Sequence, residues 1–208
     1  MKMKKILIFL ILALFLNGCH YYANKKPNYS TIVIDSIKPD SIIEPIPIII
    51  VRSTREKLID SVNAQLYVRE ITPNRAPMID IYHETVNPQQ PLYGQAWCGV
   101  FVGANLTWQG VQNPNSAWPP DYANPKDIIW TQKNKNSIPP LPGDVVTYFY
   151  SNLRRVGHTG FYESTDKDGY FITDEGNTNG TGSREGDGVF KKKRDPQKVH
   201  AISRYIKE

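Results

Sequence analysis

The fold and chemistry of this chain are most strongly restricted by residues 94–111, which read Gly-Gln-Ala-Trp-Cys-Gly-Val-Phe-Val-Gly-Ala-Asn-Leu-Thr-Trp-Gln-Gly-Val. Apolar residues recur there at helical spacing, at Trp97, Phe101, Ala104, Trp108 and Val111. This spacing predicts a helix with one stripe facing a core. Cys98 falls in its first turn, where unpaired backbone N–H groups and the helix dipole favour a nucleophilic thiolate. An inert core cysteine is the other interpretation, because free cysteines are often buried.

The beginning of the chain predicts export and attachment to a membrane. Residues 1–18 combine a basic start with an apolar stretch too short to span a bilayer, as in a signal peptide. Leu16-Asn17-Gly18-Cys19 resembles the lipobox of bacterial lipoproteins, in which the cysteine is lipidated; an ordinary cleaved signal is the alternative. We therefore expect Cys19 to anchor the protein in the cell envelope. The outer membrane is favoured, with the domain facing the periplasm or the cell surface.

Residues 19–52 are expected to form a tether, since they contain four prolines and no sustained helical period. Their apolar run at residues 46–51 either packs on the domain or contacts a protein partner. A lipidated Cys19 leaves Cys98 as the only thiol of a chain with two cysteines. An exported protein with one thiol is not using it in a disulfide, so that Cys98 is either inert or a working nucleophile.

The charge of the chain gives no argument for a nucleic-acid partner. Three of its 25 basic residues lie in the predicted signal, and the remainder carries 22 basic against 20 acidic residues. The run Lys191-Lys192-Lys193-Arg194 is a local basic segment. We interpret it as a solvated strand end, with contact to an anionic envelope polymer as the alternative.

Residues 53–208 are predicted to form one α+β domain, because helical patterns come first and strands follow. A capping box at Ser53 starts a helix whose apolar period runs to Ile71, and a second helix is expected at residues 78–86 with a solvated His83. Strands are expected at residues 145–150, 156–163, 170–174 and 188–192. The proline-rich loop after Val111 is expected to lack regular structure; its Trp118 either walls a substrate cleft or pins the loop to the core.

One predicted hairpin brings polar side chains together. A turn centred on Lys167 and Asp168 places His158 opposite Asn177, with Glu175 diagonal to it on the same face. A slip of one residue in the register would break this arrangement. Cysteine, histidine and a polar group in that chain order are typical of papain-like hydrolases, in which the third group fixes the tautomer of the base.

Four segments resemble the landmarks of CHAP domains, the cysteine, histidine-dependent amidohydrolases and peptidases related to NlpC-like and papain-like enzymes. They are residues 97–102 (Trp-Cys-Gly-Val-Phe-Val), 142–146 (Pro-Gly-Asp-Val-Val), 157–160 (Gly-His-Thr-Gly) and 175–178 (Glu-Gly-Asn-Thr). Gly99 stands where many relatives have alanine. The resemblance implies a papain-like fold with N-terminal helices packed on an antiparallel sheet, and peptidoglycan as the substrate.

The resemblance also implies roles for individual residues. Cys98 is the nucleophile, His158 the base, Glu175 the group that orients the imidazole and Asn177 a further polar member. The Cys98 backbone N–H is the first candidate for the oxyanion hole and the Gln95 side chain the second.

Trp97 and Trp118 are candidate cleft residues. The predicted activity is hydrolysis of a murein amide, either at the sugar-to-peptide bond (N-acetylmuramoyl-L-alanine amidase) or within the stem peptides (endopeptidase), with neither metal nor organic cofactor. A non-catalytic lipoprotein that binds stem peptides or a protein partner is the main alternative, and an acyltransferase with the same triad is another.

Overall fold

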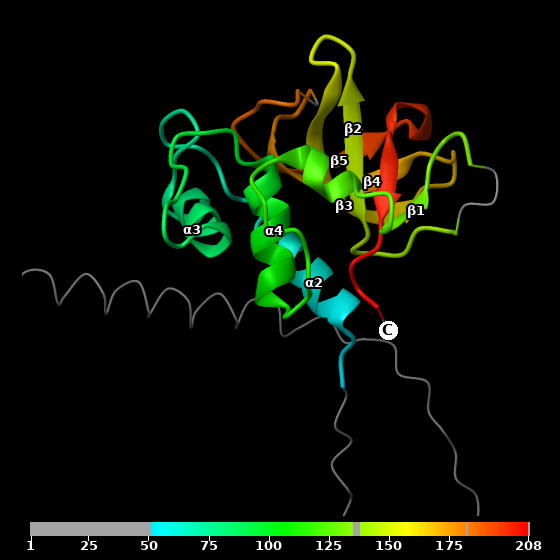
Figure 1. Cartoon of the computed structure of the whole chain (residues 1–208), viewed down its shortest axis with the longest axis horizontal. Coiled ribbons are helices and arrows are strands. Elements are labelled where there is room, and N and C mark those ends of the chain that lie inside the picture. Colours follow the sequence, from blue (N-terminus) through cyan, green and yellow to red (C-terminus); the bar gives the residue numbers. More distant parts are fainter. Residues whose placement is uncertain (1–50, 135–137, 182, 208) are drawn as a thin grey trace, which may run out of the picture. The chain divides into compact units, whose positions relative to one another are not determined.

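A computed structural model describes residues 51–134, 138–181 and 183–207 of the chain (Figure 1). The predicted signal peptide, Cys19 and all but the last two residues of the predicted tether lie outside these ranges. Within them, every helix is too short or too polar to cross a bilayer.

Three helices precede the sheet. Helix α2 spans Thr54–Asn63, α3 spans Pro77–Val86 and α4 spans Cys98–Trp108. The predicted capping box is present, with Ser53 and Glu56 bonded to each other's backbone N–H groups. The prediction that α2 continues toward Ile71 was wrong. The helix ends at Asn63, and Ile71 is 76% exposed. The chain beyond the helix instead pairs with a strand, because Val68 O accepts from Val189 N and Glu70 N donates to Asp187 O.

Six antiparallel strands form one sheet in the order β1-β6-β2-β3-β4-β5, which confirms the α+β class. Their bounds are Ile128–Trp130 (β1), Val145–Tyr150 (β2), Arg155–Thr165 (β3), Phe171–Thr178 (β4), Gly188–Arg194 (β5) and Ala201–Ser203 (β6). The four predicted strands correspond to β2 through β5. The prediction of no regular structure after Val111 was wrong in part, because that loop contains a 3₁₀ helix, Pro119–Ala123, and strand β1.

The β3–β4 hairpin has the predicted register next to the site. Phe161 lies opposite Asp174 and Tyr162 opposite Thr173, whereas a bulge beyond Tyr162 shifts the pairing by one residue toward the turn. Close to the site, a Cβ on Gly160 would lie 2.6 Å from Glu175 Cγ. Only a glycine therefore allows the carboxylate to lie across β3 at this point.

The sheet separates two groups of buried side chains. Val145 and Phe161 pack with the helices, whereas Val146 and Tyr148 pack with aromatic residues on the opposite face. Helix α4 lies between α3 and the sheet (Figure 1). Consequently every residue from Cys98 to Leu106 is buried. The prediction of one buried stripe was wrong, because these residues are buried on all sides of the helix and Trp108, a member of the predicted stripe, is 40% exposed.

Candidate active site

Cys98 is the first residue of helix α4 and its side chain is a free, buried thiol. The N–H groups in the first turn of any helix have no partner within the helix. In α4 the N-cap residue Trp97 makes no side-chain cap bond, so its side chain does not satisfy them either. The loop before Trp118 crosses this end of the helix, where a Cβ on Gly99 would lie 2.4 Å from Ala117 O. The close approach of that loop encloses Cys98 on one side and requires glycine at position 99.

His158 on β3 and Glu175 on β4 form a fully buried pair. Nε2 of His158 lies 2.9 Å from Oε2 of Glu175, and both side chains have no exposed surface. The other ring nitrogen, Nδ1, is buried and makes no hydrogen bond within the described residues. With Nε2 engaged by the carboxylate, Nδ1 is the nitrogen that can serve the Cys98 sulfur. Catalytic hydrogen bonds are often long in unliganded sites and shorten when substrate binds.

The pKa of His158 shows how strongly its neighbours act on it. Burial by itself lowers the pKa of the imidazole, but the Cys98 thiol and the Glu175 carboxylate outweigh burial and raise it to about 9. The sulfur and the ring therefore interact, although they form no hydrogen bond of normal geometry. A histidine with this pKa holds its proton at neutral pH and is the natural partner of a thiolate.

Glu175 is the centre of a hydrogen-bond network. Its Oε1 accepts from Tyr148 Oη at 2.9 Å, from Thr173 Oγ1 at 2.7 Å and from Arg194 Nε at 2.8 Å. A second guanidinium nitrogen of Arg194 donates to Oε2. Burial raises the pKa of Glu175, but the bonds from Arg194 and His158 hold it well below the usual range. The carboxylate is thus ionised at neutral pH.

Arg194 was missed by sequence reasoning. The run at residues 191–194 was expected to be a solvated strand end, and this was wrong for Lys192, which is buried, and for Arg194, whose side chain is only 16% exposed. Lys191 pairs with Glu163, Lys192 donates to the carbonyls of Asn179 and Gly180, and Lys193 pairs with Asp166. Strand alternation separates Lys191 and Lys193 from Lys192 and Arg194, which was the available signal.

Asn177 is brought to the site but not to the imidazole. Its φ of +57° ends the regular pairing of β4 with β5, whose register shifts between Glu175 and Thr178. With the amide oriented to satisfy both of its groups, Oδ1 accepts from Trp97 N at 3.0 Å and the nitrogen donates to Gly186 O at 2.9 Å. Asn177 therefore connects β4 to the residue directly before Cys98, whereas the side chain that bonds His158 among the described residues is that of Glu175.

The two tryptophans proposed for the cleft have opposite positions. Trp97 is fully buried, stacks on Tyr82 and donates through Nε1 to Glu70 Oε1 at 2.9 Å, so its assignment to the substrate cleft was wrong. Trp118 is 48% exposed, and the Arg155 guanidinium lies 3.9 Å from its ring centroid. Trp118 thus stays available to a ligand.

Two further predictions concern residues near the start of α4. Gln95 is exposed and lines a shallow cavity of about 560 Å³ together with Ala96 and Asn177. His83 was expected to be solvated, and this was wrong, because it is 1% exposed in α3. Leu92 and Ala117, which come from two loops, line one cavity with His83, and burial lowers the pKa of the His83 ring.

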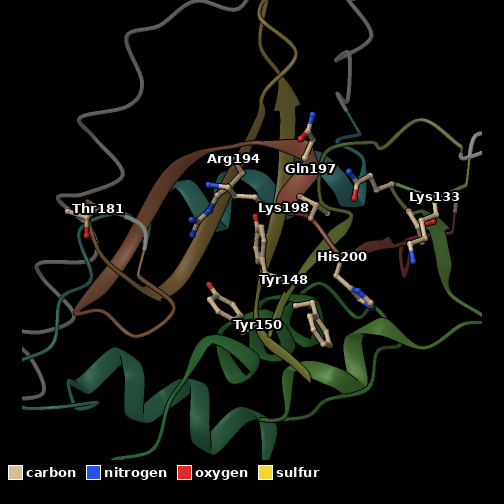
Figure 2. A pocket seen from close by; sticks show the side chains of 12 residues that line it. Lys133, Tyr148, Tyr150, Thr181, Arg194, Gln197, Lys198 and His200 are labelled. Atoms are coloured by element: carbon tan, nitrogen blue, oxygen red, sulfur yellow. The ribbon is translucent and has the colours of Figure 1, made fainter. Parts of the chain in front are cut away.

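A cavity of about 740 Å³ adjoins the buried pair on the face of the sheet opposite the helices (Figure 2). Tyr148 and Tyr150 of β2 and Arg194 of β5 line it, and Tyr148 and Arg194 are the residues that bond Glu175. Cys98 lies close enough to Tyr150 to raise the pKa of its hydroxyl, although burial is the larger cause. A ligand in this cavity would therefore lie against the side chains that hold the site.

Comparison with protein families matches the CHAP domain to residues 90–177. The matched segment contains Cys98, His158, Glu175 and Asn177, and CHAP domains are in general amidohydrolases or peptidases with peptidoglycan as the substrate. Neither the curated proteins nor the solved structures include a match to the chain. Within the described ranges, no group of three histidine, cysteine or acidic residues is placed to hold a metal ion.

Proposed function

We propose that this CHAP-type chain hydrolyses an amide bond of peptidoglycan by a thiol mechanism in which Cys98 is the nucleophile. One observation carries the proposal: Glu175 holds Nε2 of His158 at 2.9 Å, while the Cys98 thiol raises the pKa of the same ring. An inert core cysteine has no reason to lie at a helix start beside a buried imidazole whose orientation is fixed by a carboxylate.

The reaction follows from these positions. At neutral pH His158 already holds the proton that the Cys98 thiol gives up, and the thiolate paired with it attacks the carbonyl carbon of the amide. Backbone N–H groups at the start of α4, that of Cys98 first, stabilise the tetrahedral oxyanion. The C–N bond then breaks and the amine leaves with the proton from His158. Water, deprotonated by His158, hydrolyses the thioester and restores the thiol.

Glu175 and Arg194 have positioning roles in this proposal. The carboxylate fixes the tautomer and orientation of His158, and Arg194 fixes the carboxylate through two hydrogen bonds. We further propose that the chain acts in the cell envelope, attached by a lipid on Cys19. This assignment rests on the lipobox-like sequence before Cys19 alone.

The proposal is tested by incubating the full chain with purified sacculi and identifying released fragments by mass spectrometry, which also identifies the bond that is cut. Cys98→Ser, which preserves size, is expected to reduce release by about a thousandfold or more. Glu163→Gln is the control variant, because Glu163 lies outside the site, pairs with Lys191 and should leave full activity when it is replaced. A Cys98→Ser variant as active as the wild type would refute the thiol mechanism and favour a non-catalytic role.

A further inference from the structure

The charged residues around the 740 Å³ cavity are all basic. Its twelve lining residues include Lys133, Arg194, Lys198 and His200, and none of them is acidic. The sequence outside the predicted signal is almost balanced in charge, so this concentration of one sign is local. A concave site with basic groups and no acidic ones raises the local concentration of anions.

Two of these basic residues have charges that none of the described residues neutralises. The guanidinium group of Arg194 pairs with the Glu175 carboxylate. Burial lowers the pKa of His200, which makes this ring a neutral hydrogen-bonding group at pH 7. Lys133 and Lys198 are exposed and form neither an ion pair nor a side-chain hydrogen bond with the described residues. The two ammonium groups are thus available to a ligand.

The position of the cavity connects these lysines to the reaction. Tyr148 and Tyr150 form its centre, with Arg194 and Thr181 on one side and Lys133, Lys198 and His200 on the other (Figure 2). The remaining polar lining consists of hydroxyl and amide groups from Thr131, Gln132, Thr181 and Gln197. Such groups pair with the backbone of a peptide, whereas ammonium groups pair with its carboxylates.

We propose that this cavity binds the substrate peptide and that Lys133 and Lys198 select a peptide with a free carboxylate over its carboxamide. The proposal rests on the hydrolase function above and defines its substrate more narrowly. The two lysines act as specificity-determining residues through charge attraction. They touch neither Cys98 nor His158, so their removal should weaken substrate binding and leave the chemical step intact.

Binding is measured by calorimetry with full-length Cys98→Ala protein, which cannot turn over the ligand. The probes are two synthetic stem peptides of one sequence, with all carboxyl groups free in the first and all converted to carboxamides in the second. We expect the acid form to bind about fivefold more tightly at low salt, as two partly shielded ion pairs predict, and the difference to shrink at high salt. Equal affinity for the two peptides, or binding of neither, would overturn the proposal.

The residues are tested in the same background. Lys133→Gln with Lys198→Gln should abolish the preference for the acid peptide and leave affinity for the carboxamide unchanged. Lys57→Gln with Lys126→Gln removes two exposed lysines outside the cavity and should keep the preference. A preference that survives in the Lys133/Lys198 variant refutes the assignment.

Turnover separates this inference from the proposed function. In the otherwise wild-type chain, the Lys133/Lys198 variant should raise KM for the acid substrate about fivefold and preserve kcat. A chain that binds the acid peptide selectively but hydrolyses neither peptide nor sacculi would support the cavity assignment and refute the hydrolase. A chain that hydrolyses both peptides equally well would support the hydrolase and refute the cavity assignment.

Discussion

Glu175 and Arg194 are predicted to be strongly coupled in stability, and a double-mutant cycle measures the coupling. Glu175→Gln removes the charge that Arg194 faces and places an amide donor among groups that themselves donate. The Glu175 side chain has no exposed surface and that of Arg194 is 16% exposed, so water replaces little of the lost interaction. Breaking a buried ion pair on one side costs about 3–5 kcal/mol, and we expect Glu175→Gln near the lower value.

Arg194→Met is expected to cost less, about 2 kcal/mol, because His158, Tyr148 and Thr173 still bond the carboxylate. In the double variant neither charge is left alone, so its loss should fall short of the sum by about 2 kcal/mol. The free energies are obtained from urea unfolding at pH 7 followed by circular dichroism. Because the m-values must agree among the variants, a change in the denatured state would be detected.

A surface pair provides the control for this cycle. Asp166 and Lys193 also pair beside the β3–β4 turn, but Lys193 is 49% exposed, and the coupling from Asp166→Asn and Lys193→Met should be much weaker than that between Glu175 and Arg194, because water screens the exposed pair. Additive losses in the Glu175–Arg194 cycle, within about 0.5 kcal/mol, would falsify the claim that Arg194 fixes the carboxylate. The network around Glu175 therefore predicts that Glu175→Gln lowers stability as well as activity.

Three other predictions follow from the site. Cys98→Ala should abolish turnover, change stability by no more than about 1 kcal/mol and lower the pKa of His158 from about 9 in an NMR titration, because the thiol raises it. Hydrolysis by the wild type should decline as pH rises through about 9, where His158 loses the proton needed by the leaving amine; a pH–rate profile measures this. Gly176→Ala should cost about 1–3 kcal/mol in urea unfolding, since its Cβ would lie 2.6 Å from Phe101 and 2.7 Å from Trp97.

Each of these predictions has an outcome that contradicts it. An unchanged His158 titration in Cys98→Ala would mean that the sulfur does not act on the ring. Activity that persists well above pH 9 would assign the leaving-group proton to another donor. Gly180→Ala is the matched control for Gly176→Ala, because no atom lies within 4 Å of a Cβ at Gly180, and its stability should change by less than about 0.5 kcal/mol.

The stability of the protein should also depend on pH through His158. The pKa of this ring is raised above its value in the unfolded chain. The stability that it contributes is therefore complete below about pH 6.5 and is lost as the pH rises through about 9. The stability contributed by Glu175 depends on pH with the opposite sign. Its pKa is lowered, so this contribution is lost only in acid. Urea unfolding of the wild type and of His158→Gln between pH 6 and 10 should give stabilities that converge as the pH rises.

Local patterns predicted the elements that carry the site. Strand alternation gave the full span of β2, Val145–Tyr150, because a pleat depends on residues close in sequence. The predicted pairing of β3 with β4 holds at Phe161 and Tyr162, but the pairs next to the turn are shifted by one residue, so the predicted turn centre was wrong and the bulge after Tyr162 restores the pairing beside the site. The short strands β1 and β6 were not predicted, since three residues are too few to show a period.

The remainder depended on contacts between distant segments. Arg194 reaches Glu175 across the β4–β5 pairing, whose bulge near Asn177 no periodicity reveals. His83 has polar neighbours in sequence but is buried in the fold, where Leu92 and Ala117 from two loops line the same cavity. Trp97 was assigned to the cleft because it precedes the cysteine, whereas Glu70, far along the chain, bonds its ring nitrogen within the core. Burial at such positions is decided by the tertiary arrangement.

The lowered pKa of Glu175 restricts how the whole site titrates. Arg194 and His158 keep this carboxylate ionised far below neutral pH, so it takes up no proton over the range in which the enzyme would work. Two protons then remain to be exchanged, one on the Cys98 sulfur and one on the His158 ring, and they belong to the pair rather than to either residue. A pH–rate profile with two ionisations is therefore expected for the wild type.

In Arg194→Met the carboxylate keeps His158 but loses its other charged donor, so the pKa of Glu175 rises and a third ionisation should enter the acid limb of the profile. An acid limb unchanged by Arg194→Met would show that the remaining partners His158, Tyr148 and Thr173 suffice to keep Glu175 ionised.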